Sequence, residues 1–337
     1  SDEEYQKYLG GVPNEDNFSE YTLDASESLT GENIPRKVDW SKYYGEARHQ
    51  MNCGSCWAFS TSGTIEGNMK IKYNVDFIPS VQQLLDCSKE NFGCEGGRAD
   101  DAMNYFIKDG IVQEKDYPYI EKEHSYCSRN YRESYNIIEG YSKCNKRKCP
   151  REKLMEMVSK GPVSASLDAS HLGFRFHTTG LMNISQCEYK THAIIIVGYD
   201  ADEKYWLIRN SHGKDWGVNG YGKVPFSDYN DSCFLDTFAV YPNLLPISKP
   251  NPPIGPEPDR PPEPIPTPNP TPGPRPPRPV TDKCTTIYKK CNDEGTAEVV
   301  CNSQLKFNYS VAGWTIGKFI GVRAYELPNC SGSYKDD

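Results

Sequence analysis

The chain has 337 residues, of which 38 are Lys or Arg and 46 are Asp or Glu, giving a net charge of −8 at pH 7. This length allows two or three domains, each with a real hydrophobic core. The sequence has no run of basic residues that would suggest a nucleic-acid-binding face, and no apolar stretch near the roughly 18 residues of a membrane span. We therefore expect an acidic, soluble protein.

The first segment, residues 1–33, is acidic and polar and contains EEYQKYLGG. No signal peptide is visible at Ser1. We expect the chain to begin inside a precursor.

The stretch NCGSCWAFS places Cys56 where a helix is predicted to begin, with Cys53 three residues earlier. A thiol attacks as its thiolate, and the N–H groups and dipole of a helix N-terminus favour negative charge. The sequence therefore predicts a reactive thiol with a lowered pKa at Cys56.

Helices are predicted from Cys56 to about Met69, near Asp100–Lys108, and from Pro150 to a stop at Gly161, and the last two carry apolar residues at helical spacing. HAIIIVGYD and YWLIRNS are apolar runs separated by a short polar turn, which is typical of a buried hairpin. If Tyr199 lies opposite Lys204, His192 falls opposite Ser211, one step from Asn210. The hairpin would then make His192 and Asn210 neighbours.

Composition changes sharply after Tyr241. Seventeen of the 34 residues from Pro246 to Pro279 are proline, which predicts an extended polyproline II spacer. The segment from about Asp282 alternates β-favouring and polar residues and carries four cysteines, so we expect a small β module stapled by disulfides. Its aromatic residues are interpreted as core.

The chain has thirteen cysteines, which allow twelve to pair and leave one free. That number favours an oxidising compartment, and we expect a secreted protein or one held in a lysosome or other acidic vesicle. Five Asn-x-Ser sequons suit the same compartment as candidate glycosylation sites, at Asn17, Asn183, Asn230, Asn308 and Asn329.

The chain resembles the papain-like cysteine proteases in several motifs together: CGSCW at Cys53–Trp57, GCEGG at residues 93–97, QQLLDC and DYPY. It also resembles them in spacing, because His192 and Asn210 lie 136 and 154 residues after Cys56. The resemblance implies an α+β fold with a helical lobe and a β-barrel-like lobe. The expected domains are a propeptide remnant at 1–33, a catalytic domain at 34–244, a Pro-rich linker at 245–281 and the β module at 282–337.

The resemblance also implies disulfides between Cys53 and Cys94, between Cys87 and Cys127, and between Cys187 and Cys233. Cys144 and Cys149 have no counterpart in the family, and we predict a local bridge. The last four cysteines allow three connectivities: Cys284, Cys291, Cys301 and Cys330.

The function implied is cysteine endopeptidase activity through a thioester acyl-enzyme, with no cofactor and no metal. Cys56 is the expected nucleophile, His192 its acid–base partner, Asn210 the residue that orients His192, and Gln50 an oxyanion donor. Expected substrate-binding positions are Gly96, Gly97, Arg98, Ala99, Ser166, Lys190, Thr191, Trp216, Asp236 and Phe238. Closure of the pocket by Phe238 predicts a preference for small or medium side chains at the second residue before the scissile bond.

The sequence departs from the family at NSHG, where His212 stands in place of a Trp that covers the His–Asn hydrogen bond. This predicts a weaker or more pH-sensitive contact between His192 and Asn210; alternatively, His212 stacks over the pair as an aromatic lid. The expected partners of the monomeric chain are peptide or protein substrates and its own propeptide as inhibitor, with a cell-surface or matrix ligand considered for the C-terminal module. Residues 1–33 either lie in the cleft or form a flexible tail.

The cysteine motif also allows two different chemistries. CGSC is a CxxC motif, which admits a thioredoxin-like redox site, and Cys53, Cys56 and His192 could together be zinc ligands. At the level of the whole chain, two further functions stay open. The chain could be a catalytically silent relative that binds peptides, or a protein that acts mainly in adhesion or targeting through the C-terminal module.

Overall fold

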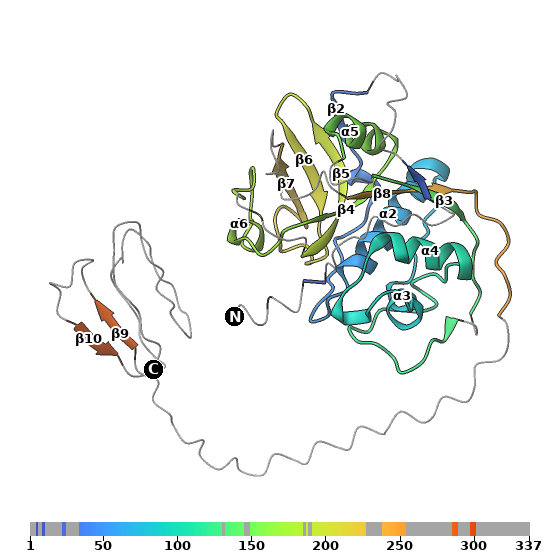
Figure 1. The fold of residues 1–337 in the computed structure, drawn as a ribbon, viewed down its shortest axis with the longest axis horizontal. Helices are drawn as coiled ribbons and strands as arrows, with labels where there is room; N and C mark the ends of the chain where they lie inside the picture. Colours follow the sequence, from blue (N-terminus) through green and yellow to red (C-terminus); the bar gives the residue numbers. More distant parts are fainter. Residues whose placement is uncertain are drawn as a thin grey trace, which may run out of the picture. The chain divides into compact units, whose positions relative to one another are not determined.

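The structure is a computed structural model that describes residues 5, 9–10, 22–24, 34–129, 132–144, 149–184, 187, 191–226, 238–253, 285–288 and 297–300. The chain divides into two compact units, Ser1–Asp259 and Arg260–Asp337. Within the larger unit, the helices of residues 56–109 gather on one side and the longer strands on the other (Figure 1). The two-lobed α+β fold expected from the sequence is confirmed.

The helical lobe contains α2 (Cys56–Tyr73), α3 (Val81–Cys87) and α4 (Ala99–Asp109), with the short 3₁₀ helices η1 (Ser41–Tyr43) and η2 (Gly93–Glu95) beside them. Helix α2 ends at Asn74, whose left-handed backbone and N–H bond to the Lys70 carbonyl form a C-cap. Helix α4 has two aspartates in its first turn and ends before Gly110. Both helices extend a few residues beyond the predicted bounds.

The second lobe is built on a mainly antiparallel sheet with the order β1-β3-β8-β4-β5-β6-β7 among the described residues, with β2 pairing on β5. Helix α5 (Arg151–Lys160) begins after Pro150 and stops at Gly161, as predicted, and α6 (Leu172–Arg175) follows β4. The strands of this sheet are β1 (Thr22–Asp24), β2 (Lys37–Asp39), β3 (Ile138–Lys143), β4 (Val163–Leu167), β5 (His192–Asp200), β6 (Tyr205–Arg209), β7 (Tyr221–Pro225) and β8 (Ala239–Leu244).

The hairpin β5–β6 exists, but its predicted register is wrong. Tyr199 lies opposite Trp206 rather than Lys204, because a turn of four residues follows Asp200 and its carboxylate accepts the N–H groups of Asp202 and Glu203. A register shift between Ile196 and Gly198 then offsets the strands again.

Two hydrophobic clusters fill the lobes, one between the sheet and α5 and one around α2, α3 and α4. Ser60 of α2 joins them, because its hydroxyl is 2.7 Å from Ser164 Oγ on β4 and donates to the Ile194 carbonyl on β5, also at 2.7 Å. This buried polar contact fixes α2, and with it Cys56, against the strand that begins at His192.

The larger unit extends further than residue 244, the predicted end of the catalytic domain. Leu245 donates its N–H to the Ile137 carbonyl, Asn251 forms an antiparallel bridge with Ser134, and Ile247 packs against the helical-lobe cluster. Backbone pairing and apolar burial therefore hold residues 245–251 to this unit.

The smaller unit is described at two strands, β9 (Thr285–Tyr288) and β10 (Ala297–Val300), which pair antiparallel. Its predicted disulfide cysteines, Cys284, Cys291, Cys301 and Cys330, lie outside the described residues.

Disulfides join Cys53 to Cys94, Cys87 to Cys127, and Cys144 to Cys149. Cys187 is also disulfide-bonded, and its expected partner, Cys233, lies outside the described residues. Each bridge shortens the loops of the unfolded chain and so favours the folded state.

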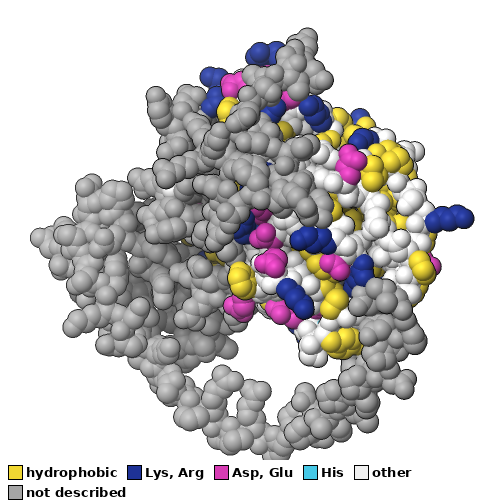
Figure 2. Space-filling view, turned by 45° about the vertical axis from the view of Figure 1, so that its right-hand side comes forward, with side chains coloured by type: hydrophobic (Ala, Val, Ile, Leu, Met, Phe, Trp, Pro, Cys, Tyr) yellow, Lys and Arg dark blue, Asp and Glu magenta, His cyan; other side chains and the backbone are white. Residues whose placement is uncertain are grey.

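On the face seen in Figure 2, acidic and basic side chains are interspersed over the described residues. None of the helices in the described ranges has the length and apolar character needed to cross a membrane.

Candidate active site

Cys56 is the first residue of α2 and is fully buried. It is the one free cysteine among the described residues. Cys53, three residues earlier, is bonded to Cys94, which ties the segment before α2 to the GCEGG loop. That disulfide removes the basis for a thioredoxin-like pair and for zinc ligation by Cys53.

The sequence predicted a lowered pKa for Cys56, whereas in the structure the pKa of this thiol is raised. Burial raises the pKa of the Cys56 thiol to about 11, although backbone amides of Ala193, Gly10 and Trp57 act in the opposite direction. The sequence argument considered the helix N-terminus alone, whereas the complete loss of solvent contact disfavours the thiolate more strongly. Gly10 belongs to the N-terminal segment, so part of this enclosure comes from outside the catalytic domain.

His192 begins β5, directly before Ala193, whose amide faces the Cys56 sulfur. Its Nε2 lies 2.7 Å from Asn210 Oδ1, and both side chains are buried. Asn210 follows β6, and its Oδ1 also accepts the Ser211 N–H at 2.8 Å. The hydrogen bond to Asn210 fixes the orientation of the imidazole.

Gln50 is fully buried and lies beside the same residues because residues 48–50 pair with residues 211–213. Its N–H donates to the Ser211 carbonyl at 2.8 Å, and its Oε1 accepts from Ser211 Oγ at 2.6 Å. Its Nε2 donates to the Cys53 carbonyl at 2.8 Å. The side chain is thus held next to the turn that leads into Cys56.

His212 lies against His192. Its ring centroid is 4.8 Å from that of His192 and 6.1 Å from that of Phe174. Extrapolating the observed β5–β6 offset places His212 opposite His192, which explains this proximity. Burial, together with the neighbouring His192 and His49, holds the pKa of His212 well below its usual range. The geometry agrees with the lid interpretation.

Replacing His212 with Trp should make the free energy of unfolding fall less between neutral and acidic pH. A His whose folded-state pKa lies below its unfolded value destabilises the fold as pH falls through about 6.5, because the unfolded chain takes up the proton first. Urea unfolding at pH 7.5 and pH 4.5 should therefore give a smaller decrease in the free energy of unfolding for His212→Trp than for the parent chain.

His212→Phe should show the same reduced decrease, since it also removes the titrating group. The hydrolysis profile of His212→Trp should also extend to lower pH, because no second imidazolium can form beside His192. Identical pH dependence in parent and variants would contradict a role for His212 titration.

The predicted substrate-binding positions fall into two groups. Gly96, Gly97, Arg98 and Ala99 lead into α4, and Ala99 and Phe238 pack in the cluster that contains Cys56. Ser166 pairs with Ala193, the Thr191 N–H donates to the Leu167 carbonyl, and Trp216 donates to the Phe174 carbonyl. Lys190 and Asp236 lie outside the described residues.

Phe238 is almost fully buried and has the ammonium group of Lys143 5.7 Å from its ring centre. Lys143 is itself buried and lies 2.6 Å from Asp100 Oδ2, which also pairs with Arg98. These neighbouring charges hold the pKa of Asp100 below its usual range despite its burial. A buried ionic cluster thus borders the position predicted to close the pocket.

The N-terminal segment reaches Cys56. The Gly10 carbonyl accepts the Gly97 N–H at 3.0 Å, and Leu9 packs against the sheet-lobe cluster. A Cβ at Gly10 would come within 1.9 Å of the Gly54 carbonyl oxygen, so the two backbones are in close contact. Tyr5 is buried, with its hydroxyl donating to the Ala169 carbonyl at 2.8 Å.

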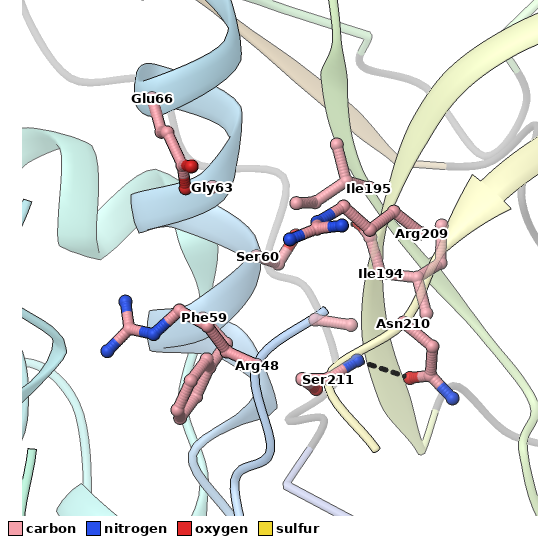
Figure 3. A pocket seen from close by; sticks show the side chains of 11 residues that line it. Arg48, Phe59, Ser60, Gly63, Glu66, Ile194, Ile195, Arg209, Asn210 and Ser211 are labelled. Atoms are coloured by element: carbon pink, nitrogen blue, oxygen red, sulfur yellow. Dashed lines mark hydrogen bonds between the residues drawn. The ribbon is translucent and has the colours of Figure 1, made fainter. Parts of the chain in front are cut away.

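A pocket lies between α2 and the β5–β6 hairpin (Figure 3). Arg48, Glu66 and Arg209 place charges around it, and burial raises the pKa of Glu66. Asn210 and Ser211 are among its lining residues, and Cys56 is not.

The sequence argument missed several residues of the site. Ser211 fixes Gln50, Phe174 packs its edge on His192 at 5.5 Å, and Tyr119 contacts Gln50. Tyr119 stands in DYPY and Ser211 follows Asn210, but neither position in the sequence indicates that its hydroxyl reaches Gln50.

The comparisons with known proteins agree with this geometry. Residues 34–243 match the papain family of cysteine proteases. The chain is 36% identical over 259 residues to cathepsin J of Mus musculus, covering 72% of this chain and 75% of that protein. It is also 36% identical over 222 residues to procathepsin L of Rattus norvegicus, covering 62% of this chain and 65% of that protein.

Among solved structures, digestive procathepsin L 3 of Tenebrio molitor larval midgut matches with a TM-score of 0.63 at 30% identity, over 72% of this chain and 79% of that one. The Carica candamarcensis cysteine protease in complex with E-64 matches with a TM-score of 0.58 at 29% identity, over 62% of this chain and 99% of that one. The chain therefore belongs to the papain family of cysteine proteases and is a cysteine-type peptidase.

Proposed function

We propose that the chain is an endopeptidase in which Cys56 is the nucleophile, His192 the proton donor and acceptor, and Asn210 the residue that orients His192. The observation that carries this proposal is the 2.7 Å bond between His192 Nε2 and Asn210 Oδ1 on the strand that faces Cys56. The bond leaves Nδ1 as the ring nitrogen available to exchange a proton with the thiol.

The reaction proceeds in two steps. The Cys56 thiolate attacks the peptide carbonyl, and His192 gives its proton to the leaving amine, so that the C–N bond breaks and a thioester forms. Neutral His192 then takes a proton from water, the resulting hydroxide attacks the thioester, and the Cys56 thiolate leaves. Each tetrahedral intermediate carries negative charge on the former carbonyl oxygen.

That oxygen is stabilised by Gln50 Nε2 and the backbone N–H of Cys56. An amide nitrogen carries two hydrogens, so Gln50 can hold the Cys53 carbonyl with one and offer the other to substrate. Removing one such donor typically costs about 2.7–4 kcal/mol of transition-state stabilisation.

The N-terminal segment acts as an inhibitor in this proposal. Gly10 occupies space beside Cys56 and bonds to Gly97, at a position where substrate backbone would bind. The domain organisation that follows is an inhibitory segment at 1–33, a catalytic domain from Ile34 to about Asn251, a spacer and the C-terminal module.

Disulfides in the described residues support an oxidising location, either secreted or in an acidic vesicle. Asn183 is exposed, as a glycosylation site requires; Asn17, Asn230, Asn308 and Asn329 lie outside the described residues.

The test uses a chain that begins at Ile34. We expect it to hydrolyse internal bonds of blocked fluorogenic peptides at mildly acidic pH under reducing conditions. E-64, which is bound in the Carica candamarcensis cysteine protease, should add to Cys56 and abolish the activity, with the adduct located by mass spectrometry of digested protein. Hydrolysis that continues after complete labelling of Cys56 would reject the proposal.

A further inference from the structure

The hydroxyl of Tyr119 connects the two segments that carry the proposed oxyanion donors. It donates to the Gln50 carbonyl at 2.5 Å and lies 3.0 Å from Ser55 Oγ. Ser55 directly precedes Cys56 and is fully buried. Since the Tyr119 proton is directed to Gln50, the Ser55 hydroxyl shares its one proton between Tyr119 Oη and the Cys53 carbonyl, which lies 3.3 Å from Ser55 Oγ.

Tyr119 is itself firmly held. Its backbone N–H donates to Glu114 Oε1 at 2.9 Å, and the same oxygen lies 2.6 Å from the Arg48 guanidinium. Its ring packs edge-on against Phe59 of α2, with centroids 4.9 Å apart. Burial raises the pKa of Tyr119 to about 12, so the hydroxyl keeps its proton at working pH and stays a donor.

The segment that carries Gln50 also bonds to the sheet lobe and to the residues just before α2. The Gln50 N–H donates to the Ser211 carbonyl and Gln50 Oε1 accepts from the Ser211 hydroxyl, and Ser211 belongs to the sheet lobe. Gln50 Nε2 donates to the carbonyl of Cys53, three residues later in the chain. The Tyr119 hydroxyl adds a direct link from the Gln50 backbone to Ser55. A shift of the hydroxyl would change the separation between Gln50 Nε2 and the Cys56 N–H.

We propose that Tyr119 is a positioning residue that sets the distance between the two oxyanion donors. It does not contact the reacting atoms; it acts through the Gln50 carbonyl and Ser55. The proposal rests on the proposed function, because it assigns Tyr119 a role in stabilising the intermediates of that reaction.

Tyr119→Phe in the chain that begins at Ile34 removes the hydroxyl and keeps the ring on Phe59. We expect kcat for a peptide amide to fall about tenfold, less than the roughly 10²–10³-fold loss on deleting a donor. KM should change less than about twofold, because ground-state binding does not use these donors. The inhibition constant of a peptide aldehyde should rise in parallel, since its hemithioacetal places an oxygen at the same site.

The rate of Cys56 alkylation by iodoacetamide should stay within about twofold of the parent, because alkylation requires the thiolate but no oxyanion site. Unchanged kcat and aldehyde inhibition would overturn the proposal. A fall in kcat matched by an equal fall in alkylation would also overturn it, because Tyr119 would then act on the thiol.

Tyr117→Phe is the matched control. Tyr117 lies two residues away, and its hydroxyl donates to Asp86 Oδ2 at 2.5 Å instead of reaching Gln50. This variant should lose stability in urea unfolding without a change in kcat or aldehyde inhibition. An equal effect of both substitutions on the kinetics would point to a general loss of loop structure and would refute the positioning role.

Ser55→Ala tests the same link from its other end. The double variant Tyr119→Phe/Ser55→Ala should lose about as much activity as Tyr119→Phe alone, because each change interrupts the same link between Gln50 and Ser55. If the parent itself fails to hydrolyse peptides, the proposed function fails, while aldehyde binding still reports whether Tyr119 shapes the site.

Discussion

A chain that begins at Ile34 is expected to hydrolyse peptides under conditions in which the full chain shows only background activity. The reason is the position of Gly10, which bonds to Gly97 and encloses the Cys56 sulfur. Removal of residues 1–33 exposes the thiol to solvent and frees the backbone groups that substrate would use. Initial rates on one fluorogenic peptide, normalised to total Cys56 by active-site titration, measure the effect.

The thiol should also become more acidic after trimming. Burial raises the pKa of Cys56 to about 11 in the chain that keeps the segment, so its thiolate forms only at high pH. The pH at half-maximal iodoacetamide alkylation should therefore move downward in the trimmed chain. Equal alkylation profiles with equal activity would show that residues 1–33 do not block the site.

A point substitution should reproduce part of this activation in the full chain. Gly10→Val would place a side chain against the Gly54 carbonyl, where even a Cβ comes within 1.9 Å, and so should displace the segment. Gly45→Ala is the control, because a Cβ there meets nothing within 4 Å. Activation by Gly45→Ala, or none by Gly10→Val, would argue against a block at this contact.

Replacing Cys56 with Ala should abolish hydrolysis in the trimmed chain, with a loss on the order of 10⁶-fold, as expected when the nucleophile of a catalytic unit is removed. Cys56 is fully buried at the start of α2, so the smaller Ala side chain fits without strain. The comparison requires kcat of both proteins at matched concentration and at the pH optimum of the parent.

The folded state of Cys56→Ala should be preserved, because the disulfide between Cys53 and Cys94 is untouched. Its thermal unfolding and its affinity for a non-cleavable peptide should therefore match those of the parent within error. Residual hydrolysis above about one part in 10³, in a preparation free of other proteases, would mean that Cys56 is not the nucleophile.

Much of this site could be predicted from the sequence, because its signals are local. Apolar residues at helical spacing predicted α4 and α5, and the glycines that follow these two helices predicted where they stop. The spacing of Cys56, His192 and Asn210 in a recognisable motif predicted the residues that the structure brings together. Each of these inferences depends on a residue type and its near neighbours.

The register of β5–β6 could not be predicted from local pattern, because a turn residue with positive φ, Lys204, and the shift near Gly198 changed the count of opposed residues. The extension of the catalytic unit to Asn251 depended on pairing with Ser134, more than one hundred residues earlier in the chain. Contacts of this kind form between segments that are far apart in the sequence, so a local pattern does not predict them.

The sequence by itself determined the family, the helices α2, α4 and α5 and the residues proposed for catalysis, since these follow from side-chain type and short-range spacing. Only the tertiary structure decided the raised pKa of Cys56, the packing of His212 against His192 and the link from Tyr119 to Gln50. A pKa depends on which atoms exclude water and which charges lie nearby, and those atoms come from segments that the fold alone brings together.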